Sequence, residues 1–257
     1  MRLFAVNALY SYKALFRWQS PEAYVLQKMM FPLIQLTFFA LIGQFGGSRP
    51  LAFYLIGNCI AVAFRPMFSI TTAIADERNG GTLPFLIASP ASRIVLFFGR
   101  ATLHVIDGMF DIVVAFAFAI VVFGLRLPDS SLPGMALAVL VASLAACGMG
   151  FFLGALAYVV LDAVFLANVV MFALLLLTGA NIPLSELPAP ARAFGEALPL
   201  THTIAAARAY AQGLELEAGL PLLIGDVILG LLWALGGFAL FTLLEHQARR
   251  RGTLEAV

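Results

Sequence analysis

Long apolar runs constrain this chain more than any other feature of its sequence. Six of them, at about 24–44, 51–74, 95–124, 133–160, 163–180 and 220–244, are near or above the roughly 20 residues that a helix needs to cross a bilayer. A soluble core cannot hide so much apolar surface, because 62% of the 257 residues are hydrophobic and only 11% are charged. The sequence therefore predicts an all-α integral membrane protein, a single domain over 1–257 with six transmembrane helices.

The charge and cysteine content argue against a nucleic-acid-binding protein and against a disulfide-rich fold. A net charge of +1 without any basic block gives no indication of a nucleic-acid partner, and membrane lipid is the expected surrounding. Cys59 and Cys147 both fall inside apolar runs, so we expect no disulfide framework.

Two stretches outside the apolar runs have a pattern of their own. Residues 1–22 combine aromatic residues with Lys13 and Arg17, which favours an amphipathic interfacial helix, with a frayed terminus as the alternative. Residues 181–213, before the last apolar run, are too polar to span a membrane. Their prolines bracket two short amphipathic helices, expected at about 189–197 and 201–212.

The placement of lysine and arginine predicts the orientation in the membrane. With both termini in the cytoplasm, the inner side holds most of the cations: Arg2, Lys13, Arg17, Lys28, Arg78, Arg93, Arg100, Arg249, Arg250 and Arg251. The outer side holds Arg49, Arg126, Arg192 and Arg208. This bias places residues 75–93 in the cytoplasm and residues 181–213 outside.

The passage 75–93, ADERNGGTLPFLIASPASR, interrupts two apolar runs with charges, a Gly-Gly pair and two prolines. It could form a short helix under the membrane with an apolar side available to another protein. An ordinary interfacial loop is the alternative that the residues alone leave open.

Three motifs in this order resemble the type-2 ABC permease family. In the passage 75–93, Glu77-Arg78, Gly81-Thr82 and Ser89-Pro90 match that family's cytoplasmic segment in order and spacing. Pro84 departs from it, because an acidic residue is common there. In the outer segment, Pro183, Leu187-Pro188 and the run Leu198 to Thr201 followed by Arg208 resemble the family's pattern.

The resemblance implies a half-transporter in a bacterial or archaeal cytoplasmic (inner) membrane. Two permease chains, identical or related, would pair around a central path, with two cytoplasmic ABC ATPase subunits below. Residues 75–93 would act as a coupling helix, with the following side chains as its contacts: Glu77, Arg78, Gly81, Thr82, Leu83, Phe85, Leu86, Ser89 and Pro90. The two outer helices would be re-entrant and form an exit gate, with Pro188, Pro199, Thr201 and Arg208 among its residues.

The sequence places ATP hydrolysis elsewhere. A P-loop needs Gly-Lys followed by Ser or Thr. Only Lys13 and Lys28 exist here, and they follow Tyr12 and Gln27. We therefore expect no catalytic residue and no cofactor on this chain, with ATP and Mg²⁺ bound by the partner subunit.

Charged residues inside the apolar runs are the other candidate site. Arg65 precedes Pro66, which is expected to kink the second span, and Asp107 and Asp111 lie one turn apart at a similar depth. A buried charge costs several kcal/mol unless it is paired or hydrated. Three interpretations stay open: an ion pair of Arg65 with one aspartate, a polar wall of the substrate path, or a proton or metal site that includes His104.

Smaller signals concern helix ends and helix packing. Asp162, between the fourth and fifth runs, is expected to cap the fifth helix. Ala146, Gly150 and Gly154 recur every four residues and predict close packing within the chain.

The substrate is the least constrained part of the prediction. Phe165, Asn168 and Phe172 form a mostly apolar face in the fifth run, which favours export of a hydrophobic or amphipathic substrate, such as a drug, lipid or peptide, although helix packing explains the same face. Export of a lipid-linked polysaccharide is the alternative within this family. An ion-coupled secondary transporter and a membrane-embedded enzyme are alternatives from other classes.

Overall fold

The computed structural model describes residues 20–47, 49–79, 93–157, 159–160 and 162–251, and within these it contains helices and no strands. The all-α fold class is therefore confirmed. The α-helices are α2 (Pro21–Gly46), α3 (Leu51–Ala61), α4 (Phe64–Asn79), α6 (Arg93–Phe123), α7 (Leu132–Ala157), α8 (Ala163–Leu177), α9 (Ala189–Glu196), α10 (Thr201–Ala211) and α11 (Leu216–Arg251). Short 3-10 turns occur at Asp129–Ser131 and Leu184–Glu186.

Among the described residues, five stretches of helix are long and apolar enough to cross a membrane: Pro21–Gly46, Leu51–Ala73, Leu103–Phe123, Asp129–Ala157 and Leu216–Leu244. The sixth predicted span, 163–180, is the 15-residue helix α8. At 1.5 Å per residue α8 is about 22 Å long, less than the roughly 30 Å of a bilayer core. The protein is a multi-pass membrane protein, and the sixth crossing stays a prediction.

The second span is interrupted rather than only kinked. Helix α3 ends at Ala61 and α4 begins at Phe64. Pro66 explains the break, because its ring nitrogen has no hydrogen to donate to the Val62 carbonyl and its ring crowds that carbonyl. The amide of Arg65 donates to this oxygen instead, at 3.0 Å. Gly108 of α6 leaves room for the Pro66 ring, since a Cβ there would lie 2.6 Å from Pro66 Cγ.

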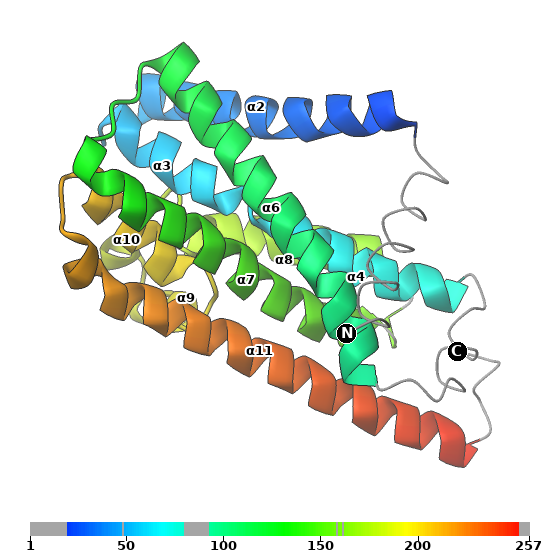
Figure 1. Cartoon of the computed structure of the whole chain (residues 1–257). Helices are drawn as coiled ribbons and strands as arrows, with labels where there is room; N and C mark the ends of the chain where they lie inside the picture. Colours follow the sequence, from blue (N-terminus) through cyan, green and yellow to red (C-terminus); the bar gives the residue numbers. More distant parts are fainter. Residues whose placement is uncertain (1–19, 48, 80–92, 158, 161, 252–257) are drawn as a thin grey trace.

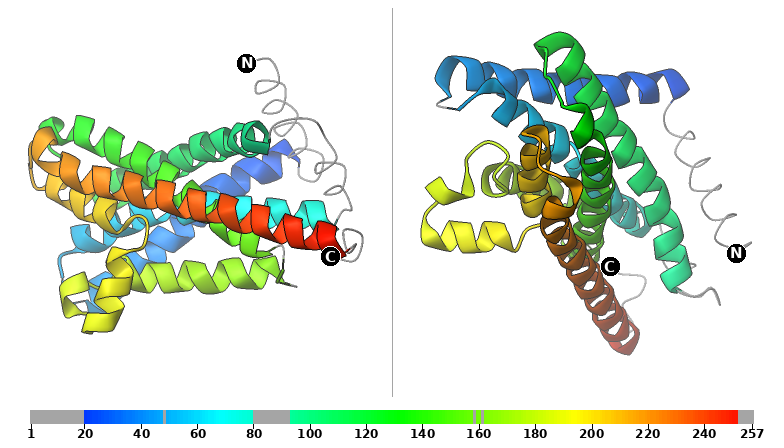
Figure 2. Two further views of the ribbon diagram at one scale, coloured as in Figure 1. Left: turned by 90° about the horizontal axis from the view of Figure 1, so that it is seen from below. Right: turned by 60° about the vertical axis from the view of Figure 1, so that its left-hand side comes forward.

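The long helices run side by side and alternate in direction (Figures 1 and 2). One end of the bundle carries the α2–α3 turn, the α6–α7 link, α9, α10 and the start of α11 (Figure 1). The other end carries the start of α2, the end of α4, the start of α6 and the end of α11 (Figure 1). The alternation agrees with the predicted topology, in which residues 75–93 and the C-terminal end of the last span share one side.

Helix α7 lies at the centre and packs against α4, α6, α8, α10 and α11. Its glycines allow the closest approaches. A Cβ on Gly148 would overlap the Gly230 carbonyl of α11, and a Cβ on Gly150 would lie 3.0 Å from Met67 Cα of α4. Gly150 belongs to the predicted small-residue stripe, and its contact with α4 confirms that the stripe packs within the chain.

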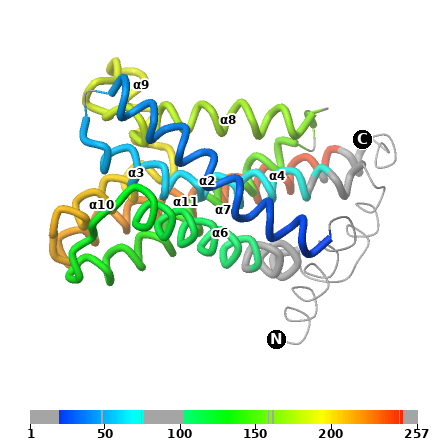
Figure 3. Tube along the Cα trace, turned by 90° about the horizontal axis from the view of Figure 1, so that it is seen from above, coloured from blue at the N-terminus to red at the C-terminus, as the bar shows by residue number. Residues whose placement is uncertain are grey.

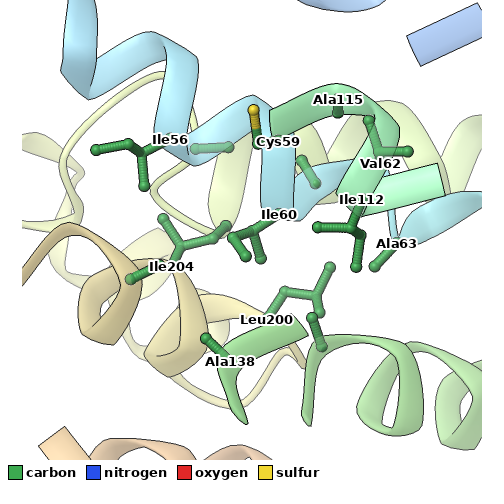
Figure 4. Close-up of a cluster of buried hydrophobic side chains, with 14 of the residues drawn as sticks. Ile56, Cys59, Ile60, Val62, Ala63, Ile112, Ala115, Ala138, Leu200 and Ile204 are labelled. Carbon is green, nitrogen blue, oxygen red and sulfur yellow. The ribbon is translucent and has the colours of Figure 1, made fainter. Parts of the chain in front are cut away.

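The main core gathers where α3, α6, α7 and α10 meet. Ile60, Ile112, Ala138 and Ile204 come from these four helices and point toward one another (Figure 4). Both cysteines are buried free thiols, as expected.

Candidate functional site

A group of charged side chains lies between α2, α4 and α6, in an otherwise apolar part of the bundle. Lys28 of α2 forms ion pairs with both Asp107 and Asp111 of α6, and its Nζ lies 2.8 Å from Asp111 Oδ2. Lys28 is 3% exposed and Asp111 is fully buried. We call Lys28, Arg65, Asp107 and Asp111 the charge cluster.

Arg65 joins this cluster from α4. Its Nε lies 3.8 Å from Asp111 Oδ2, near the outer limit of an ion pair, and its Nη1 donates to the Gln27 carbonyl at 3.3 Å. The guanidinium also lies 4.9 Å from the centre of the Phe31 ring. The structure thus brings Arg65 to Asp111, as the sequence suggested, but gives it a weaker contact than Lys28 has.

Helical periodicity explains why these side chains meet. Asp107 and Asp111 are four residues apart and share one face of α6. Lys28 starts the buried stripe of α2, which continues through Pro32, Leu36, Ala40 and Gly43. Tyr24, one turn before Lys28, donates a hydrogen bond to Asp107. The stripe therefore presents its only charge where α6 presents its two carboxylates.

Lys28 is the member of the cluster that sequence reasoning missed. The orientation argument assigned it to the cytoplasmic side because it lies close to the start of its apolar run. That argument gave Lys28 no partner, whereas the structure buries it and pairs it with Asp111 between helices. The signal was present, because an ionisable residue within a spanning segment indicates a buried partner.

Charge balance accounts for the burial of the cluster. Two cations face two carboxylates, so the set is neutral when all four are ionised. Burial of an unpaired charge is costly, and each charge here has a partner of opposite sign. Within the charge cluster, Asp111 Oδ1 is buried without a hydrogen-bond partner among the described residues. His104 lies one turn before Asp107 and has contacts of its own. The described residues include no group of three or more His, Cys, Asp or Glu side chains that could hold a metal.

The candidate path residues lie on an open face of α8. Phe165 and Phe172 are 66% and 64% exposed, and Asn168 turns its amide back onto the Val164 carbonyl, at 2.8 Å. Asp162 caps this helix by accepting the Phe165 amide at 2.8 Å, which confirms the predicted cap. The face therefore contacts no other part of the described chain over most of its area and is free to meet lipid, substrate or another subunit.

The outer segment forms helices at the predicted places, with α9 over 189–196 and α10 over 201–211. Pro188 precedes α9, and Pro199 lies in the turn between the two helices. Leu200 ends this turn with φ of +75°, a left-handed conformation that costs a residue other than glycine about 1–2 kcal/mol. The Thr201 hydroxyl donates to the Gly195 carbonyl at 2.7 Å and closes the turn. Their re-entrant position in a membrane stays a prediction.

Arg208 of α10, one of the predicted gate residues, points its guanidinium into the bundle. Its Nη1 donates to Gly179 O and its Nη2 to Ala180 O, both at 2.8 Å, and Nη2 also donates to Phe53 O at 3.0 Å. The guanidinium stacks on the Phe53 ring, 3.4 Å from its centre. Arg208 therefore ties α10 to α3 and to the end of α8.

The predicted coupling residues are only partly described. Glu77 and Arg78 lie in the last turn of α4. Gly81, Thr82, Leu83, Phe85, Leu86, Ser89 and Pro90 lie outside the described residues, as do residues 1–19 of the predicted interfacial helix. The helices on either side of the coupling segment, α4 and α6, end and begin at the same end of the bundle (Figure 1), and their coloured parts run toward the end where α2 starts (Figure 3).

Comparison with known protein families gives one match. The family model described as ABC-2 type transporter matches residues 5–211. None of the curated proteins matches the chain. The match includes the charge cluster, the passage 75–93, helix α8 and both short outer helices.

Proposed function

The chain belongs to the ABC-2 type transporter family and is a transport permease, not a catalytic domain; on that premise, we propose that it is the membrane subunit of an ATP-driven exporter. Two copies, or this chain with a related one, pair around a central path and move a hydrophobic or amphipathic substrate outward by alternating access. A separate cytoplasmic ATPase binds ATP and Mg²⁺ and supplies the energy.

The extent of the family match carries this proposal, because residues 5–211 include the passage 75–93, helix α8 and both short outer helices. The passage 75–93 connects α4 and α6, and both of these helices contribute to the charge cluster. A push on that passage would act directly on two helices of the bundle. Glu77 and Arg78 would orient the passage on the ATPase, and Leu83, Phe85 and Leu86 would supply apolar contact.

The second copy is proposed to cover the open faces of α2 and α8. Both helices expose large apolar side chains, among them Ile34 and Phe38 of α2 and Phe165 and Phe172 of α8. Helix α8 packs on α4, and α2 packs on α3 and α6. In the family, the first and fifth spans more often form the seam between subunits, and α2 and α8 occupy these positions.

Because the two copies are proposed to pair around the path, the open face of α8 would border both the second copy and the substrate, and the proposed substrate class follows from it. Its two exposed phenylalanines offer apolar contact, and the side-chain amide of Asn168 donates a hydrogen bond to a backbone carbonyl of its own helix. Apolar surface binds substrate by removing water from both partners, so the face suits a lipid-like or drug-like molecule better than a sugar chain. Lipid-linked polysaccharide export by the same machinery is the alternative.

Transport into sealed vesicles tests this proposal. The chain is reconstituted with its ATPase subunit, and a fluorescent phospholipid analogue and a lipophilic dye serve as probes. We expect accumulation that requires ATP hydrolysis and stops when the ATPase is omitted. Equal accumulation without the ATPase, driven by an ion gradient, would reject the proposal in favour of a secondary transporter.

A further inference from the structure

A second buried charge pair lies apart from the charge cluster and joins α10 to α11. Asp226 of α11 is fully buried, and its Oδ1 lies 3.1 Å from Nδ1 of His202 on α10. The His202 side chain is 30% exposed, so its ring can exchange protons with the surroundings while the carboxylate cannot.

The same carboxylate also caps α10 from outside that helix. Asp226 Oδ2 accepts the Thr203 amide hydrogen at 2.7 Å. Thr203 is the third residue of α10, and the first amides of a helix have no acceptor within it. The N-cap residue of α10, Leu200, has no side chain that could accept them. Asp226 therefore supplies the cap that the sequence of α10 lacks.

We propose that His202 and Asp226 form a proton-binding site that fastens the start of α10 to α11. A buried carboxylate is stable only with a positive or hydrogen-bonding partner. The protonated imidazole provides the charge, and the Thr203 amide provides the second hydrogen bond. When His202 loses its proton, the Asp226 carboxylate keeps its hydrogen bonds but no longer has a positively charged partner. The contact between the start of α10 and α11 then weakens.

The groups that act on His202 are acidic. They are Asp226 on α11 and Glu196, the last residue of α9. The hydrogen bond to Asp226 is the main reason that the pKa of His202 is raised above its ordinary value, and burial opposes the effect. A raised pKa means that His202 binds its proton more tightly when it is in contact with Asp226 than when that contact is broken. The stabilisation is complete below the ordinary pKa of about 6.5 and disappears as pH rises through the raised value.

A second hydrogen bond to α11 involves no titratable group and is therefore independent of pH. The Trp233 Nε1 hydrogen is donated to the carbonyl of Ala197, just after α9, at 3.2 Å. This bond holds the end of α9 on α11 at any pH. Deprotonation of His202 should therefore release the first turn of α10 while the end of α9 stays in place.

Hydrogen–deuterium exchange of the full chain in lipid nanodiscs tests this site. After correction for intrinsic exchange, peptides covering 198–212 should lose protection as pH rises above about 6.5, by at most about tenfold per pH unit because one proton is linked. Peptides covering 189–197 should change little. His202→Gln keeps a hydrogen-bond donor without the charge and should abolish the pH dependence. His246→Gln, at an exposed histidine on α11, is the control and should leave it unchanged.

A direct titration completes the test. The His202 ring resonance, assigned by its absence in His202→Gln, should titrate above the ordinary value, and Asp226→Asn should bring it back down. Titration of native His202 at or below the ordinary value would overturn the proposal. So would a pH dependence of exchange in His202→Gln equal to that of the native chain. Neither result depends on transport, so failure here leaves the proposed function standing.

Discussion

At the scale of single residues, burial and distance distinguish the two cations of the charge cluster, Lys28 and Arg65. Lys28 is almost completely buried and lies 2.8 Å from Asp111, whereas Arg65 is 3.8 Å from the same carboxylate and has a backbone acceptor and an aromatic ring besides. Lys28 should therefore contribute more to the stability of the folded chain. Its loss would leave two carboxylates with only a distant cation.

This difference predicts an order of effects. Lys28→Met should lower the free energy of unfolding by about 3 kcal/mol, the lower end of what removal of one partner from a buried pair costs. Arg65→Ala should cost about 1 kcal/mol, as for a partly exposed pair. Lys28→Met combined with Asp111→Leu should recover most of the loss, because the buried charge is removed with its partner. Unfolding in detergent measures all three, and an Arg65→Ala variant less stable than Lys28→Met would contradict the assignment.

Sequence reasoning found the aspartates and Arg65 because an isolated charge in an apolar run is conspicuous. It counted Lys28 on the inner side without recognising its burial, because distance along the chain does not show which side of a helix a residue faces. The His202–Asp226 pair was missed for a related reason. Its members are 24 residues apart on two helices, and only the packing of α10 on α11 brings them together.

At the scale of elements, two glycines of α11 differ in how much room the neighbouring helix α7 leaves for a side chain. A Cβ on Gly230 would lie 2.7 Å from Ala145 Cα of α7, whereas a Cβ on Gly236 would lie 3.5 Å from the Phe152 ring. The first distance requires the backbones to move, and the second is an ordinary contact. The two positions therefore offer a matched pair of substitutions on one helix.

We expect Gly230→Ala and Gly236→Ala to change stability in opposite directions. Replacement of glycine by alanine within a helix gains up to about 1 kcal/mol from backbone entropy. At Gly236 that gain should be retained, while at Gly230 an overpacking cost of about 1–3 kcal/mol should outweigh it. Thermal unfolding of both variants checks this. Equal stabilities would mean that α7 and α11 do not approach as closely as the structure shows.

The helix boundaries were predictable where local chemistry sets them. Prolines mark the starts of α9 and α10, and Asp162 marks the start of α8. The end of α8 was placed too late, at 180, because the apolar pattern continues to Ala180 while the chain already turns. Helix α8 ends at Leu177, and Gly179 adopts φ of +80°. Hydropathy alone does not register such a turn.

At the scale of the whole molecule, α8 and α11 each have an open apolar face. Exposure alone does not show which face meets a second copy and which meets lipid, so an experiment has to decide. Phe172 of α8 and Leu235 of α11 are each 64% exposed. We expect a Phe172→Cys chain to form a disulfide with a second copy in oxidised membranes, and a Leu235→Cys chain to stay monomeric on denaturing gels. The natural cysteines are buried and should not react. The reverse result would place the subunit seam on α11.

The family assignment and the alternation of the helices were both accessible from the sequence, because the motifs and the apolar runs occur in order along the chain. The number of full crossings was not, because it depends on how far α8 extends. The side of the membrane on which each end of the bundle lies remains a prediction from the distribution of lysine and arginine.

The central claim is that the passage 75–93 connects this permease to an ATPase that it does not contain. The direct measurement is ATP hydrolysis by the ATPase that co-purifies with the chain, compared between the native protein and a variant with Leu83→Asn and Phe85→Asn. A control carries Leu214→Asn and Leu216→Asn, two exposed leucines at the opposite end of the bundle. We predict that the native and control chains retain the ATPase and its activity and that the Leu83/Phe85 variant loses both. Retention of the ATPase at native stoichiometry and activity by that variant would contradict the account.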